Sequence, residues 1–129
     1  MGKTQEESAE TLEAFVQSED NNWEVLKEFN NIPKTSELYT QLYYKARQKI
    51  RKYAESVKQE LLGPVSILES MNPNSKEWNE SDMKLAKQIL DDTEGLRNNM
   101  NQCVAAVQDV FKVDFNVYLN TAPEKHYKD

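Results

Sequence analysis

The most regular feature of the sequence is a pair of long segments in which apolar side chains recur every three or four positions. This spacing places the side chains on one face of an α-helix, and neither segment shows the alternation of a strand. The first helix is predicted over 36–62, about 40 Å at 1.5 Å per residue, and the second opens at Ser81. The predicted stripes are Leu38, Leu42, Ala46, Ile50, Tyr53, Val57 and Leu61, then Ala86, Ile89, Thr93, Leu96, Met100, Cys103, Val107 and Val110, widened by Leu90, Val104 and Phe111.

Two shorter helices are predicted ahead of the first long one. Ser8 is a suitable N-cap for the first of them. The second is predicted to begin at Asn21, with Glu24 completing a capping box, and to end before Pro33. The side chains expected to pack in the core are Leu12, Phe15, Val16, Trp23, Leu26 and Phe29.

The dipeptide Gly63-Pro64 is predicted to end or bend the first long helix near Leu62. Proline lacks the backbone N–H and clashes with the preceding turn, and the residue before it is disfavoured in the α conformation. The segment 64–71 should then fold back as a short separate helix with Val65, Leu68 and Met71 turned inward. If Leu62 stays uncovered beside other apolar side chains, that end of the bundle becomes a second candidate interface.

The segment 113–120 fits two structures. Positions 113, 115, 117 and 119 are apolar in alternation, as in a strand, whereas positions 111, 115 and 119 are apolar at helical spacing. Because no other strand is predicted to pair with this one, a helix or an ordered apolar tail is favoured. Residues 1–7 and 121–129 are expected to be loose.

These patterns together predict an all-α fold. The chain has 129 residues, which suits one domain over 1–129, and only three Gly and four Pro, too few for a turn-rich sandwich or barrel. Two long helices joined by residues 63–80 must lie roughly antiparallel. We therefore expect a single-domain bundle of four to five helices built on two long antiparallel amphipathic helices.

The charge is unevenly distributed. The net charge is −6, with an acidic N-terminal third and a basic segment over 34–60. An acidic chain lacks the basic surface that phosphate binding needs, so no nucleic-acid partner is expected. We expect the positive charges of the basic segment to be balanced within the protein by the carboxylates of the acidic N-terminal segment. No membrane span is expected either, since no apolar run approaches the required length.

The inventory of reactive side chains argues against an enzyme. His126 is the one histidine and lies in a polar tail, and Cys103 is the one cysteine and lies mid-stripe, where a buried core residue is the ordinary interpretation. The sequence has no glycine-rich phosphate loop, and the acidic run 91–95 lacks the ligand spacing of a calcium loop. No catalytic residue, metal ligand or cofactor is therefore predicted. Asn79 begins a formal glycosylation sequon, but we favour Ser81 of that sequon as a helix N-cap.

One surface feature stands out on the basic helix. At 100° per residue, the side chains Tyr44, Arg47, Gln48 and Arg51 share one outward patch. Tyr and Arg are enriched at binding hot spots, so these four residues are the predicted partner-binding site. The alternative is a solvated basic face with Tyr44 lying over a neighbouring side chain.

The leading functional hypothesis is a non-enzymatic helical binding protein that acts through contacts with another protein. The alternative is a carrier of a small apolar ligand, held between helices by the adaptable side chains Met71, Met83, Met100, Phe111 and Tyr53. As a small acidic helical chain rich in Asn and Tyr, it is similar in composition to mature secreted effector or salivary proteins of arthropods and parasites. No motif carries that similarity. The sequence is compatible with a secreted protein after signal-peptide removal and with a cytoplasmic one.

Overall fold

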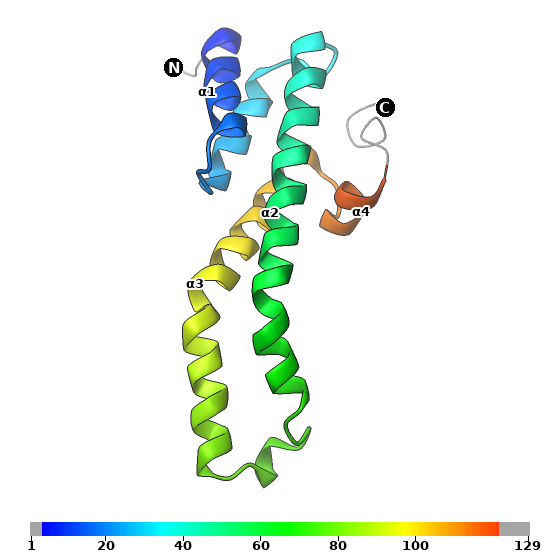
Figure 1. Cartoon of the computed structure of the whole chain (residues 1–129). Helices are drawn as coiled ribbons and strands as arrows, with labels where there is room; N and C mark the ends of the chain where they lie inside the picture. The colour runs from blue at the N-terminus through cyan, green and yellow to red at the C-terminus, as the bar shows by residue number, and fades with distance from the viewer. Residues whose placement is uncertain (1–3, 122–129) are drawn as a thin grey trace. The chain divides into compact units, whose positions relative to one another are not determined.

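The computed structural model describes residues 4–121, and the tail that contains His126 lies outside them. The described residues contain no strand, which confirms the all-α prediction (Figure 1). The elements in chain order are α1 (Gln5–Gln17), the 3-10 helix η1 (Trp23–Asn31), α2 (Glu37–Glu69), the 3-10 helix η2 (Ser75–Glu77), α3 (Glu80–Phe111) and α4 (Phe115–Asn120). They form two compact units, one of Tyr53–Met100 and one of the residues on either side of it. The assignment of 1–129 to a single domain stays a prediction.

The unit formed by the residues before Tyr53 and after Met100 has an aromatic core. The ring of Phe29 lies edge-on to those of Tyr39 and Phe111, with both centroid distances 5.2 Å. Tyr118 from α4 stacks on Phe111 at 5.5 Å. Tyr43, which is fully buried, contacts both Phe111 and Tyr118. Burial of such large side chains is the main stabilising contribution in a unit of this size.

The 3-10 geometry of η1 follows from its spacing. Trp23, Leu26 and Phe29 are three residues apart, and a 3-10 helix has three residues per turn, so the three side chains stack on one side. All three are buried. The core positions predicted for this segment are confirmed, whereas the predicted α-helix capped by Asn21 is wrong, since η1 follows Asn22 without a side-chain cap.

The unit Tyr53–Met100 is an antiparallel helical hairpin. The second half of α2 runs against the first two-thirds of α3, and η2 lies in the connection between them (Figure 1). Its core is thin, with Val57, Ala86 and Ile89 as the buried apolar side chains. Leu90, which was expected to widen the apolar stripe, is instead 51% exposed.

The predicted break at Gly63-Pro64 is wrong. Helix α2 continues through Pro64 to Glu69, and no separate helix folds back over 64–71. The absent N–H of Pro64 removes the bond to the Glu60 carbonyl, but Glu60 and Gly63 are exposed, so water can hydrate that carbonyl. Only about one further turn of helix follows Pro64 before α2 ends at Glu69.

Two predicted helix starts are shifted by a better N-cap. Helix α1 begins at Gln5, because Thr4 and Glu7 form a reciprocal capping box. Residues 4–7 are therefore ordered, and Ser8 is instead buried and accepts a hydrogen bond from Asn31 Nδ2 at 3.0 Å. Helix α3 is capped by Asn79 and not by Ser81: the Asn79 Oδ1 accepts from the Asp82 N–H at 2.8 Å.

Replacing Gly95 with Ala should raise the free energy of unfolding by about 0.5–1 kcal/mol, because glycine is a poor residue for a helix interior. Gly95 is exposed, and an added Cβ would have no atom within 4 Å. Gly63→Ala is the matched comparison, since its Cβ also has open space. It should gain less, because a Cβ before Pro64 disfavours the α conformation. Denaturant unfolding followed by far-UV circular dichroism tests this, and equal gains at both positions would contradict it.

Candidate functional site

The structure brings together all the side chains of the predicted partner-binding site. Tyr44, Arg47, Gln48 and Arg51 lie along α2 and line one open hollow of about 310 Å³, with Lys45 as a further member. We call this the α2 hollow. Tyr44, Gln48 and Arg51 are exposed. The outward orientation predicted for Tyr44 is confirmed by its 44% exposure.

Arg47 has a different environment from the rest of the α2 hollow. Its Nε donates to the Tyr118 carbonyl at 3.0 Å, and its Nη2 donates to the carbonyls of Leu119 at 2.9 Å and Thr121 at 3.0 Å. These carbonyls lie at the C-terminal end of α4 and just beyond it, where a helix turns carbonyls toward donors from other elements. A cation at this end also interacts favourably with the helix dipole. Arg47 thus joins α4 to α2, and these hydrogen bonds hold its side chain in place where it lines the α2 hollow.

Other cations of the basic segment are also used within the same unit. Lys49 Nζ donates to the carbonyls of Phe15 and Ser18, both at 2.8 Å, at the end of α1, and lies 4.1 Å from the Phe15 ring centroid. Partial burial is the main cause that lowers the pKa of Lys49. Lys45 pairs with Glu13 at 2.8 Å, and this hydrogen bond lowers the pKa of Glu13. The expected balance of the basic segment by the acidic N-terminal segment is therefore confirmed for Lys45.

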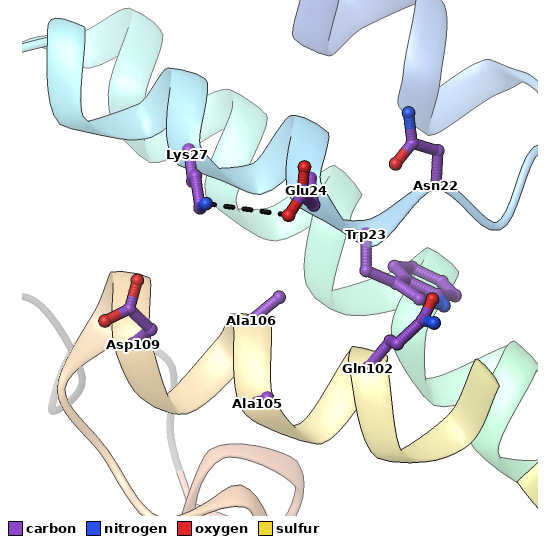
Figure 2. Close-up of a pocket in the computed structure, with 8 residues that line it drawn as sticks. All are labelled: Asn22, Trp23, Glu24, Lys27, Gln102, Ala105, Ala106 and Asp109. Atoms are coloured by element: carbon purple, nitrogen blue, oxygen red, sulfur yellow. Dashed lines mark ion pairs between the residues drawn. The ribbon is translucent and has the colours of Figure 1, made fainter. Parts of the chain in front are cut away.

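A second and larger hollow lies between η1 and the last turns of α3 (Figure 2). It measures about 470 Å³ and is lined by Asn22, Trp23, Glu24, Lys27, Gln102, Ala105, Ala106 and Asp109. We call it the η1–α3 hollow. Figure 2 shows the small side chain of Ala106 on α3 pointing toward the space below η1. The 3.7 Å ion pair of Lys27 with Glu24 borders it on the η1 side.

The η1–α3 hollow is not predicted by the hydrophobic pattern of the sequence. Its one available signal was the pair Ala105-Ala106, where two small side chains follow each other on a helix otherwise rich in larger ones. That signal becomes informative only when η1 is known to lie opposite. On the α3 side of the hollow, Asp109 forms an ion pair with Lys112 at 3.7 Å.

The Cys103 side chain is fully buried, as expected for a core residue. Burial raises the pKa of its thiol to about 12. The fraction of thiolate, the reactive form, is therefore negligible near neutral pH.

We expect the native protein to resist a thiol reagent such as Ellman's reagent at pH 8 for hours, and to react fully once unfolded in guanidinium. The chain has one cysteine, so the absorbance reports Cys103 alone. Complete labelling of the folded protein within minutes would show that α3 opens locally or that the thiol is accessible.

The side chains proposed to hold an apolar ligand are distributed over both units. Phe111 is buried in the aromatic core, whereas the Met83 side chain is 56% exposed on α3. None of these five residues lines the α2 hollow or the η1–α3 hollow. The ligand-carrier hypothesis stays a prediction.

No group of three or more His, Cys, Asp and Glu side chains within residues 4–121 is placed to hold a metal ion. No helix in the same range is both long enough and apolar enough to cross a bilayer. Comparison of the chain with protein-family models, with curated proteins and with solved structures found no match.

Proposed function

We propose that this protein is a non-enzymatic binding protein that contacts another protein through the α2 hollow. The observation that supports the proposal is the convergence of Tyr44, Gln48 and Arg51 on one exposed concave surface beside a rigidly held Arg47. Tyr and Arg supply much of the binding energy in protein interfaces. Prior fixation of Arg47 also reduces the entropy that ordering this surface would cost on binding.

The charge of the α2 hollow indicates the kind of partner. Three cations, Lys45, Arg47 and Arg51, border it on a chain whose net charge is −6. Of these, Arg51 makes no ion pair within residues 4–121. A partner surface that presents carboxylates would gain charge-assisted hydrogen bonds from this side chain.

The test is capture of a partner from the native source with the tagged full-length chain. We expect the double variant Tyr44→Ala, Arg51→Ala to retain at least about 10-fold less of that partner than the wild type, as removal of hot-spot residues does. The control is Gln41→Ala, Lys52→Ala, which removes an exposed polar and an exposed basic side chain of α2 outside the hollow. Arg47 is left unchanged because its loss would disturb α4.

The melting temperature of each variant separates binding from folding. The two double variants should melt within a few degrees of the wild type, since surface substitutions usually change stability by about 0.5 kcal/mol or less. Equal capture by both variants would remove the α2 hollow as the binding surface. A fall in melting temperature for the first double variant alone would show that Tyr44 or Arg51 has a structural role.

A further inference from the structure

The hairpin unit exposes more apolar side chains than it buries. Its exposed large side chains are between 42% and 56% accessible: Leu62, Val65, Ile67, Met83, Leu85 and Leu90. Its buried apolar side chains are Val57, Ala86 and Ile89. Exposed apolar side chains that share one side of such a hairpin commonly mark an interface.

The register of the hairpin follows from one cross-helix hydrogen bond. The Tyr53 hydroxyl on α2 donates to the Asn99 Oδ1 on α3. In an antiparallel pair, moving forward along α2 corresponds to moving back along α3. Five residues from this bond, Lys58 is therefore level with Glu94, and nine residues from it, Leu62 is level with Leu90.

Four of the exposed apolar side chains share one side of the seam between the two helices. With 3.6 residues per turn, and with Val57, Ala86 and Ile89 directed at the seam, the positions of Leu62 and Val65 on α2 and of Met83 and Leu90 on α3 turn to the same side. We call this set the hairpin face. Ile67 and Leu85 fall on the opposite side.

A charge pattern accompanies the hairpin face. Lys58 on α2 and Glu94 on α3 border it at the same level, and both are exposed. Neither makes an ion pair within the described part of the chain. At one level, α2 thus carries the cation Lys58 and α3 carries the anion Glu94. At a second level, α2 carries Leu62 and α3 carries Leu90.

We propose that a second copy of this chain docks on the hairpin face, with the two-fold axis parallel to the hairpin. That symmetry places α2 of one copy against α3 of the other and leaves the level of each residue unchanged. Leu62 of one copy then meets Leu90 of the other, and Lys58 meets Glu94, each contact occurring twice. The two hairpins complete a four-helix bundle in which every neighbour is antiparallel. The match at equal levels of Leu62 with Leu90 and of Lys58 with Glu94 is what selects a second copy as the occupant.

The first test is the mass of the full chain in solution by sedimentation equilibrium. The wild type should sediment at twice the 15.0 kDa chain mass. Leu62→Glu and Leu90→Glu should each weaken dimerisation at least about 10-fold while the far-UV circular dichroism is unchanged, because each buries a carboxylate at the interface. The matched control, Leu85→Glu, changes another exposed leucine, on the opposite side, and should stay dimeric.

The second test exchanges the bordering charges. Lys58→Glu alone and Glu94→Lys alone each set like charges against each other across the interface and should weaken the dimer. The double variant restores opposite charges and should recover the wild-type dissociation constant within about 3-fold, since the pairing energy returns.

Three results would overturn the proposal. They are a wild type that stays monomeric up to about 100 μM, a charge-exchanged double variant no better than its single variants, and equal dissociation by Leu85→Glu and Leu62→Glu. The interface uses none of the α2 hollow residues, so its failure would leave the proposed function standing, and the reverse also holds.

Discussion

Replacing Phe29 with Ala should lower the free energy of unfolding by about 3–5 kcal/mol, the usual cost of removing a buried aromatic side chain. Phe29 is 1% exposed, and its ring meets the rings of Tyr39, Tyr43 and Phe111 with centroid distances of 5.2, 6.5 and 5.2 Å. Edge-to-face pairs such as these add about 0.5–1.5 kcal/mol each beyond the buried area. The residue also joins η1 to α2 and α3, so no single neighbour can move to fill the space.

The measurement is guanidinium unfolding followed by near-UV circular dichroism, which reports the packing of the aromatic core. Leu85→Ala is the control, because it truncates an exposed side chain of the hairpin unit and should change stability by about 0.5 kcal/mol or less. A loss below about 1 kcal/mol for Phe29→Ala would mean that the cluster collapses around the space, contrary to the close packing of its rings.

The helices were predictable wherever one pattern dominated a long segment. The stripe Ala86, Ile89 and Thr93 was predicted from its spacing and is buried, because a helix that packs on one neighbour needs only one apolar side. The assumption of one apolar side underestimated the number of buried side chains in the N-terminal half of α2. There Tyr39 and Tyr43 are buried in addition to the predicted Leu42, Ala46 and Ile50, whereas the predicted Leu38 is only half-buried. The core also includes rings from η1, α3 and α4.

The errors arose where a local preference competes with tertiary packing or with another cap. Pro64 is a strong local signal against a helix, but α2 passes through it, and the Glu60 carbonyl that loses its N–H donor belongs to an exposed residue. The ambiguity at 113–120 had a similar origin. Lys112 adopts a φ of 55°, a conformation that glycine usually provides, and so ends α3 without a sequence signal for the turn into α4.

The residues of the α2 hollow were predictable as a set, because their positions on one helix face follow from helix geometry alone. Their separate roles were not. The contacts of Arg47 lie 71–74 residues further along the chain, and no local pattern indicates that the end of α4 returns to this point. Helical spacing therefore predicted which side chains share the surface. Tertiary contacts decide which of them already forms hydrogen bonds within the protein.

Replacing Arg47 with Ala should lower the free energy of unfolding by about 2–3 kcal/mol, the range for hydrogen bonds to a charged group that is partly shielded from water. Three carbonyls each lose the hydrogen bond from the guanidinium at once. Helix α4 has only six residues, far fewer than an isolated helix needs to be stable, so it depends on such contacts and on the burial of Phe115 and Tyr118.

Two comparison variants distinguish this role from a simple effect of charge. Arg51→Ala removes an equal charge from the same hollow and should change stability by about 0.5 kcal/mol or less. Arg47→Lys keeps the charge but lacks the planar group that reaches all three carbonyls, so it should recover only part of the loss. Amide hydrogen exchange in α4 should accelerate in Arg47→Ala and stay unchanged in Arg51→Ala. If Arg47→Ala were as stable as Arg51→Ala, Arg47 would be free to contact a partner directly, and it would then belong with Tyr44 and Arg51 in the binding test.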